Sequence, residues 1–504
     1  MKNRSPTILC IMDGWGLSSN KLGNAIDLAE TPNYDYLLSN NPSTQLITHG
    51  LDVGLPENQM GNSEVGHANI GAGRIVYMDL PKIDDAIENG DYNKNPKLLN
   101  FINKLKKSKG SAHLLGLASD GCVHASMNHL IKTTQIISDH NVPVLLHLLT
   151  DGRDVAPKSA AKFLKSIIKE LPPTAKIATV TGRYFAMDRD NNWDRIKKAY
   201  DAIVFAKGHS SESSLKAVQD SYANNRTDEF IYPTVISSYN GPKDGDGFLC
   251  LNFRSDRVRQ IMSAIASPTF KKFDVSKQPN WELVTGMTKY SDEHSTFMSN
   301  LFSNKPINNT LGVWTSKHGY TQLRLAESEK YPHVTFFLNG GHENIEAGET
   351  RFMPKSPKVL TYDLAPEMSS REVTDKLIEA IKNKIDLIIV NYANPDMVGH
   401  TGDLKAAVKA CEAIDLALKR ILPVLEESNG CMLLTSDHGN CETMINLETK
   451  EPHTSHTTNL VPAILIGRNR KLRQIGRLAD IAPTLLELMD LPKPTEMTGE
   501  SLLC

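Results

Sequence analysis

Short apolar runs alternate with amphipathic segments along most of the chain. Between residues 112 and 257 an apolar run repeatedly ends in glycine and polar residues, and a segment with helical periodicity follows. This alternation is typical of a parallel sheet that helices cover on both faces. The strands expected in this region are 112–118, 142–149, 176–180 and 248–253, and the helices are 127–140, 158–170 and 193–205.

The regions before and after this one have a similar pattern. We expect strands at 7–12, 334–338, 387–390, 431–435 and 462–466, and helices at 33–38, 404–426 and 480–489. A different region begins near residue 80, and the polar stretch 304–312, which contains Pro306, marks a second boundary. A chain of 504 residues is also too long for one ordinary domain. The expected fold is α/β with two domains, each a largely parallel sheet flanked by helices.

Composition excludes several classes of protein. Hydrophobic residues make up 40% of the chain, charged residues 23%, and the formal net charge is -2. These values are typical of a globular protein that binds neither nucleic acids nor membrane surfaces in general. The seven cysteines form no CxxC pair, which argues against a disulfide framework and a thiolate zinc site. The apolar run 8–12 is too short for a signal peptide and no run has transmembrane length, so we expect a cytoplasmic protein.

Charged side chains follow the expected strands of the middle region. Arginine is a fixed cation whose planar fork matches carboxylate and phosphate oxygens. Each arginine alone could instead pair with a neighbouring aspartate, but the set as a whole favours a small substrate with several negative charges. The residues concerned are His124, Arg153, Asp154, Arg183, Arg189, Arg254 and Arg257.

Aspartate and histidine residues near other strand ends suggest a metal site. Asp396 and His400 are four residues apart, which places both on one face of a helical turn. Asp437 and His438 are adjacent, and Asp13 and His456 complete three carboxylates and three imidazoles. This mixture of oxygen and nitrogen suits Mn²⁺, Zn²⁺, Co²⁺ or Mg²⁺. Two such ions could activate a nucleophile and hold the oxygens of a phosphoryl group.

Ser63 is the candidate nucleophile. It lies between Gly61 and Gly66, and small neighbours let a ligand approach the backbone closely. A serine hydroxyl needs a base or a metal for activation. The segment alone could be a glycine-rich surface loop, but the metal-type residues elsewhere favour a nucleophile that attacks phosphate.

Six segments together resemble the cofactor-independent phosphoglycerate mutases, which belong to the alkaline phosphatase-like superfamily of metalloenzymes. The metal-type motifs are shared across that superfamily, including phosphatases, sulfatases and phosphopentomutases, whereas the arginine-bearing motifs narrow the resemblance to the mutases. The segments are Asp13-Gly14-Trp15-Gly16, 61–67, Asp151-Gly152-Arg153-Asp154, 182–190, 252–257 and Ser436-Asp437-His438-Gly439-Asn440.

The resemblance implies roles for individual residues. It implies one metal ion on Asp396, His400 and His456, and another on Asp13, Ser63, Asp437 and His438. Ser63 would carry the phosphoryl group, Lys330 would reach that group, and Asp154 would act as general acid or base on the glycerate hydroxyls. The arginine set and His124 would hold the glycerate. His453, close to His456 in sequence, is a competing metal ligand.

The resemblance also implies a reaction and an architecture. The reaction is the interconversion of 3-phosphoglycerate and 2-phosphoglycerate in glycolysis and gluconeogenesis, without 2,3-bisphosphoglycerate. The implied phosphatase-like domain joins 1–78 with 312–504, and the implied substrate-binding domain, 79–311, is inserted into it. By analogy the enzyme is a monomer with two divalent ions, for which we expect Mn²⁺, with Mg²⁺, Co²⁺ and Zn²⁺ as alternatives.

Some observations leave room for other functions. Cys122, Ala125 and Ser126 depart from the usual family pattern around His124. A metal-dependent phosphatase or a phosphopentomutase would keep the metal motifs without needing the arginine set. A metal-stabilised binding protein for anionic metabolites would not need a serine beside the metal ligands.

Overall fold

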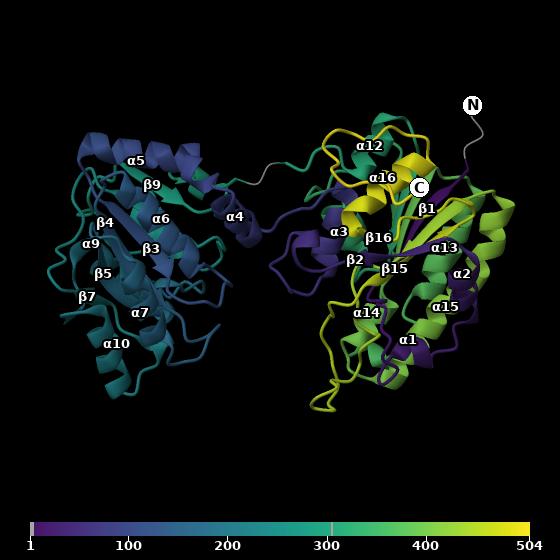
Figure 1. Cartoon of the computed structure of the whole chain (residues 1–504), viewed down its shortest axis with the longest axis horizontal. Helices are drawn as coiled ribbons and strands as arrows, with labels where there is room; N and C mark the ends of the chain where they lie inside the picture. Colours follow the sequence, from purple (N-terminus) through teal and green to yellow (C-terminus); the bar gives the residue numbers. More distant parts are fainter. Residues whose placement is uncertain (1–4, 304–305) are drawn as a thin grey trace. The chain divides into compact units, whose positions relative to one another are not determined.

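The computed structural model describes residues 5–303 and 306–504, which form two compact units (Figure 1). Unit 1 comprises the described residues of Met1–Met78 and Pro306–Cys504, and unit 2 those of Asp79–Lys305. Two parts of the expected domain organisation lie outside the described residues. They are residues 1–4 of the segment 1–78 and residues 304 and 305 of the boundary stretch 304–312. Each unit contains a mostly parallel eight-stranded sheet with helices around it, so the predicted α/β class is confirmed.

The sheet of unit 1 has the strand order β12-β11-β13-β1-β14-β15-β2-β16. Strands β12, β11, β13, β1 and β14 are parallel neighbours, whereas β15 is antiparallel to both β14 and β2. The strand bounds are β1 Thr7–Met12, β2 Ser43–Ile47, β11 Gln322–Ala326, β12 Glu349–Phe352, β13 Leu387–Tyr392, β14 Cys431–Thr435, β15 Val461–Ile466 and β16 Ile475–Arg477.

Both faces of this sheet are covered. Alternate residues of β1 point to opposite faces, so that Ile8 and Cys10 join one apolar cluster while Leu9 and Ile11 join another. Helices α1, α2, α13 and α15 contribute to the first cluster, and α3, α12 and α16 to the second. The helix bounds are α1 Ala25–Leu28, α2 Pro32–Asn40, α3 Ser63–Ala72, α12 Leu311–Lys317, α13 Ser370–Lys382, α14 Asn394–Gly399, α15 Leu404–Glu427 and α16 Ile481–Leu488.

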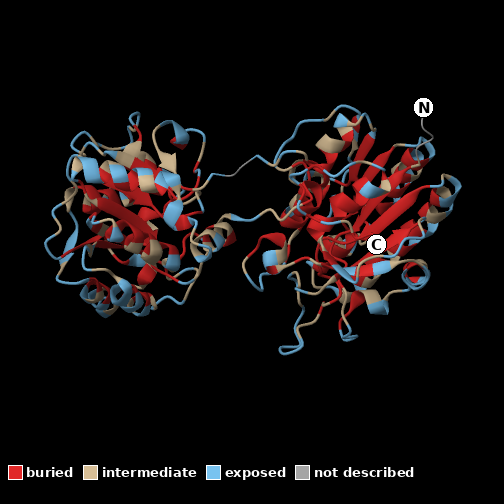
Figure 2. Ribbon diagram, turned by 45° about the horizontal axis from the view of Figure 1, so that its top comes forward, coloured by how far each residue is buried: buried red, intermediate tan, exposed pale blue. Residues whose placement is uncertain are grey.

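The sheet of unit 2 has the order β10-β9-β8-β3-β4-β5-β7-β6, and all neighbours except β5 and β7 are parallel. Figure 2 shows the central strands of both units as buried, whereas edge strands such as β6 and β16 contain exposed residues. The strands are β3 Ala112–Leu117, β4 Val144–Thr150, β5 Ala175–Gly182, β6 His209–Ser211, β7 Thr234–Ile236, β8 Gly247–Cys250, β9 Leu283–Gly286 and β10 Ser299–Asn300. The helices are α4 Asp79–Glu88, α5 Pro96–Ser108, α6 Met127–Asp139, α7 Ala160–Glu170, α8 Arg183–Ala186, α9 Trp193–Phe205, α10 Ser214–Ala223 and α11 Arg259–Ala266.

One expected strand is wrong. The segment expected as strand 334–338 forms a π-helical turn, η5, at His333–Phe337. A short apolar run has no periodicity that distinguishes a buried strand from a buried helical turn. Val334 and Leu338, four residues apart, both enter the core beneath α3, and Pro332 at the start of the turn favours a helical conformation. Within the described residues, no helix combines the length and apolar character needed to cross a membrane.

Candidate metal centre and anion-binding cluster

Three adjacent parallel strands of unit 1 bring three carboxylates together. Asp13 follows β1, Asp437 follows β14, and Asp396 lies in α14 just after β13. Because parallel strands end at the same edge of a sheet, these side chains converge there. Two glycines permit the close approach. Gly14 has φ +77°, and a Cβ on it would lie 2.8 Å from the Asp396 Cα, while a Cβ on Gly66 of α3 would lie 3.1 Å from the Asp437 Cβ.

Ser63 is not in a surface loop but is the first residue of α3. Asn62 caps this helix, since its side-chain oxygen accepts a hydrogen bond from the Val65 N–H. The Ser63 side chain is buried, and its Oγ lies 3.1 Å from Asp13 Oδ1 and 2.9 Å from His438 Nε2. The hydroxyl is therefore held among the groups that the sequence assigned to the metal site.

Lys330 lies at the centre of this cluster. Its Nζ donates to Asp13 Oδ1 at 2.7 Å, to Ser63 Oγ at 2.7 Å and to Asp396 Oδ2 at 2.6 Å. Burial alone would lower the pKa of Lys330, but attraction to Asp13 and Asp396 outweighs burial and raises it above its usual range. Burial likewise opposes ionisation of Asp13, yet the Lys330 ammonium holds the pKa of Asp13 well below its usual range. A fixed positive charge therefore contacts the candidate nucleophile.

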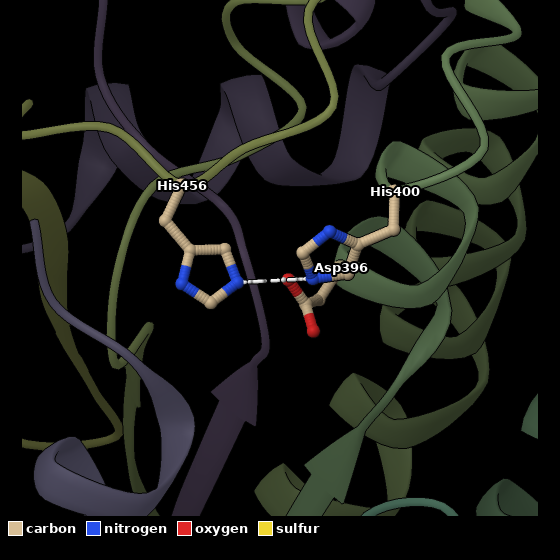
Figure 3. Close-up of side chains that lie close together, drawn as sticks. All are labelled: Asp396, His400 and His456. Atoms are coloured by element: carbon tan, nitrogen blue, oxygen red, sulfur yellow. Dashed lines mark hydrogen bonds and ion pairs between the residues drawn. The ribbon is translucent and has the colours of Figure 1, made fainter. Parts of the chain in front are cut away.

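The first candidate ligand set is Asp396, His400 and His456 (Figure 3). Nδ1 of His400 lies 2.8 Å from the Thr454 carbonyl and Nδ1 of His456 lies 2.8 Å from the Gly61 carbonyl, so both Nδ1 atoms carry hydrogen. In the neutral rings both Nε2 lone pairs then face each other at 3.0 Å, and each lies within 3.2 Å of Asp396 Oδ1. Three electron-pair donors that converge in this way fit a cation.

The second candidate set is Asp13, Ser63, Asp437 and His438. The Asp437 carboxylate is fully buried, and neither of its oxygens accepts a hydrogen bond from a described residue. Burial lowers the pKa of His438, but the nearby Asp437 and Asp13 carboxylates raise it to about 9. A site that attracts a proton this strongly also attracts a divalent cation, so these oxygen and nitrogen donors fit a metal ion as well.

Substitution of the two competing histidines provides a test of the first set. His456→Ala is expected to weaken metal binding by at least about 10-fold, because it removes one of three convergent donors. His453→Ala is the matched control, since His453 Nδ1 contacts the Thr443 carbonyl and lies outside the clusters of candidate ligands. Metal content after gel filtration, measured by mass spectrometry, checks the prediction. Equal losses in both variants would contradict it.

Unit 2 gathers its charged residues in a similar way. Strands β8, β3, β4 and β5 are adjacent and parallel, so their carboxyl ends lie at one edge of the sheet. Each of these strands is followed by one or more residues of the set identified in the sequence. His124 follows β3, Arg153 and Asp154 follow β4, Arg183 and Arg189 follow β5, and Arg254 and Arg257 follow β8.

Arg183 is the buried centre of this second cluster. One guanidinium nitrogen, Nη1, donates to Asp151 Oδ1 and to Asp154 Oδ2, both at 2.5 Å, and Nη2 lies 3.0 Å from His124 Nε2. Because a guanidinium only donates, Nε2 of His124 must accept, and the ring hydrogen is on Nδ1. Burial and the positive charge of Arg183 lower the pKa of His124 to about 4, so its ring is neutral at neutral pH.

The remaining arginines surround this centre and are more exposed. Burial, together with repulsion from Arg189, Arg183 and Arg153, lowers the pKa of Arg257. This repulsion indicates that four guanidinium groups lie close enough together to favour an anion. The pairing with acids considered for single arginines also occurs, since Arg189 and Arg254 contact Asp256 at 3.0 and 3.3 Å, and Arg153 contacts Glu229 at 3.5 Å.

Comparisons with known proteins identify the family of this chain. The sequence model of the metalloenzyme superfamily matches residues 5–493. The chain is 56% identical to the 2,3-bisphosphoglycerate-independent phosphoglycerate mutase of Ruegeria pomeroyi over 505 residues, which cover 100% of both chains. It is 55% identical to the mutase of that name from Paracoccus denitrificans, over 100% and 99% of the two chains.

The chain belongs to the 2,3-bisphosphoglycerate-independent phosphoglycerate mutase family. The family predicted from the motifs is thereby confirmed, and with it the assignment of the chain as an isomerase and a member of the metalloenzyme superfamily. A crystal structure of Leishmania mexicana phosphoglycerate mutase at low cobalt concentration is similar, with a TM-score of 0.59 and 29% identity, and the match covers 99% and 98% of the two chains.

Several residues of both clusters were not singled out from the sequence. Asp151 lies within one of the recognised motifs and holds Arg183, while its Oδ1 also accepts from the Asp154 N–H at 3.1 Å. His67 and Asn391 lie beneath the second ligand set, and Asn440 donates to Asp396 Oδ1 at 2.8 Å. Membership of a motif was the only available signal for Asp151, His67 and Asn440, and Asn391 could be found only as the polar end of an apolar strand.

Proposed function

We propose that this member of the family interconverts 3-phosphoglycerate and 2-phosphoglycerate, in glycolysis and gluconeogenesis, through a phosphoserine at Ser63. The observation that carries the proposal is the buried Ser63 hydroxyl, which lies 2.7 Å from the Lys330 ammonium and within 3.1 Å of Asp13 and His438. The names of the full-length relatives support phosphoglycerate as the substrate and 2,3-bisphosphoglycerate as unnecessary.

The proposal includes two divalent metal ions. Asp396, His400 and His456 would hold one, and Asp13, Ser63, Asp437 and His438 the other. Such ions, when bound, supply Lewis acidity to the Ser63 hydroxyl and to the phosphoryl oxygens. We propose Mn²⁺ by analogy with the family, and the same donors accept Mg²⁺, Co²⁺ or Zn²⁺. The same analogy supports a monomer, and we propose a cytoplasmic location from the sequence pattern.

In this proposal, side chains of unit 1 carry out the phosphoryl transfer and side chains of unit 2 bind the glycerate. The Ser63 hydroxyl, which donates to Asp13 Oδ1, would lose its proton as Oγ attacks the phosphorus atom. The bond from phosphorus to the glycerate oxygen O3 breaks, and O3 takes up a proton. The Lys330 ammonium stabilises the charge on the phosphoryl oxygens. The arginines of unit 2 hold the glycerate carboxylate, and Asp154, fixed by Arg183, exchanges a proton with the glycerate hydroxyls. The 2-hydroxyl then attacks the phosphoserine and loses its proton. The bond from phosphorus to Ser63 Oγ breaks, Ser63 takes up a proton, and 2-phosphoglycerate is formed.

Purified protein should convert 3-phosphoglycerate to 2-phosphoglycerate without added 2,3-bisphosphoglycerate. A chelator should abolish the reaction and excess Mn²⁺ should restore it, because the proposed ligands then regain their ions. Coupled enolase absorbance measures isomerisation, and a parallel assay measures free phosphate. Release of phosphate without isomerisation would identify a phosphatase instead, and activity that survives complete metal removal would contradict the two-metal proposal.

A further inference from the structure

Two fully buried residues connect the carboxylates of the second ligand set from behind. Asn391, in β13, donates from Nδ2 to Asp13 Oδ2 at 2.7 Å, and the same nitrogen lies 3.1 Å from His67 Nε2. On the other side of its ring, His67 Nδ1 lies 2.8 Å from the Ser63 carbonyl and 3.2 Å from Asp437 Oδ2. His67 and Asn391 therefore contact or face three of the four proposed ligands.

The hydrogen positions in this network follow from its acceptors. The Ser63 carbonyl can only accept, so His67 Nδ1 carries the hydrogen, and its partial positive charge faces Asp437. Nε2 of the neutral ring is then an acceptor and receives one hydrogen of the Asn391 amide. The other amide hydrogen goes to Asp13. Each N–H group of His67 and Asn391 thus has one defined acceptor, and only one assignment of hydrogens satisfies these three contacts.

The local fold keeps both residues in place. Asn391 pairs in register with Ile11 on the neighbouring strand, two residues before Asp13. His67 lies one helical turn after Ser63, on the same side of α3. The His67 ring also packs edge-to-face against His333 of η5, with 5.5 Å between ring centroids. Asn391 on the strand can fix the rotation of the Asp13 carboxylate through its hydrogen bond. His67 on the helix places its polar N–H edge 3.2 Å from Asp437 Oδ2, which favours one orientation of that carboxylate electrostatically.

We propose that His67 and Asn391 are positioning residues that orient Asp13 and Asp437 and so set the metal affinity of the second ligand set. The proposal rests on the proposed function, because it assumes that this set holds an ion. His67 lies with Asp13 and Asp437 in a cluster of candidate metal ligands. Its Nδ1 hydrogen is directed at the Ser63 carbonyl and its Nε2 accepts from Asn391, so we assign the ring to support of the ligands rather than to the ion itself. Removal of such outer partners lowers metal affinity by about 10- to 100-fold in other metal sites.

Asn440 offers an internal comparison. It donates to Asp396 Oδ1, in the first ligand set, at 2.8 Å. Its removal should therefore weaken the first metal site rather than the second. His318 offers a matched control, because its Nδ1 also contacts a carbonyl one helical turn earlier, that of Trp314, at 2.8 Å, but it lies outside the clusters of candidate metal ligands.

Titration of metal-depleted full-length protein with Mn²⁺, followed by calorimetry, tests the proposal. Two binding events are expected for the unaltered protein. His67→Phe and Asn391→Leu should each weaken one event by about 10- to 100-fold, Asn440→Leu should weaken the other, and His318→Gln should change neither. His67→Asn, whose amide nitrogen can stand near the Nδ1 position, should recover part of the loss. At saturating Mn²⁺ the turnover of His67→Phe should return to within about 3-fold of the unaltered enzyme.

The outcomes separate this inference from the function on which it rests. Unaltered affinity in His67→Phe and Asn391→Leu, with two events still present, would overturn the positioning role and leave the proposed function intact. Complete loss of one equivalent of metal in His67→Phe would also overturn it, since His67 would then be a ligand. An unaltered protein that binds no Mn²⁺ would instead contradict the two-metal function. A fall in turnover that saturating Mn²⁺ does not restore would assign His67 to folding or to the reacting groups.

Discussion

Ser63→Ala is expected to reduce mutase turnover by about 10⁴-fold or more, because it removes the only atom in the cluster proposed to accept the phosphoryl group. The hydroxyl is buried and points at Asp13, His438 and Lys330, so no bulk water replaces it directly. Coupled measurement of 2-phosphoglycerate formation checks turnover. Mass spectrometry of acid-quenched protein should detect a phosphorylated peptide containing Ser63 in the unaltered enzyme and not in the variant.

A second serine provides the control for this substitution. Ser370 is also buried in unit 1 and also begins a helix, α13, but its hydroxyl donates to the Glu367 carbonyl. Ser370→Ala should keep turnover within about 3-fold of the unaltered enzyme, because the residue lies outside the proposed machinery. Ser63→Ala should retain the three-residue metal set of Asp396, His400 and His456. Full mutase activity in Ser63→Ala would exclude the phosphoserine route.

The strands that carry the site could be predicted from the sequence because they are buried on both faces. All six residues of β1 and all five of β14 are buried, and such continuous apolar runs identify central parallel strands. The polar residue after each run then indicates the functional edge. The same criterion, a continuous apolar run, wrongly predicted a strand at 334–338. A single apolar helical turn packed beneath α3 has the same composition as a short strand.

The convergence of the site could not be predicted from spacing alone. Strand β1 lies between β13 and β14, which come some 380 and 420 residues later in the chain, and only the sheet topology makes Asp13 a neighbour of Asp396 and Asp437. Family resemblance supplied this grouping in advance. It assigned no role to Asn391 or His67, because their contribution depends on which way one amide and one ring face, and that direction is set by packing.

Arg183→Met is expected to lower kcat/KM for 3-phosphoglycerate by about 10²- to 10³-fold. Removal of one partner of a buried charge pair typically has an effect of this size, because the other charge stays buried without compensation. The buried guanidinium donates to both Asp151 and Asp154 and faces His124. Its loss leaves the Asp151 carboxylate without the cation that contacts it, although Ser119 and the Asp154 N–H still donate to it, and frees Asp154 from its fixed position. Arg183→Lys should give an intermediate loss, because an ammonium keeps the charge but cannot reproduce the planar fork.

The same variant distinguishes a mutase from a phosphatase. If the unit 2 cluster retains glycerate after phosphoryl transfer, a weaker cluster should release glycerate early, and water should then hydrolyse the phosphoserine. The ratio of free phosphate to 2-phosphoglycerate should therefore rise in Arg183→Met. Arg226→Met is the control in unit 2, since Arg226 stacks on Tyr232, with 4.1 Å from its guanidinium carbon to the ring centroid, and does not belong to the cluster. A folded Arg183→Met protein that isomerises normally without added phosphate release would show that the arginine cluster does not hold the glycerate.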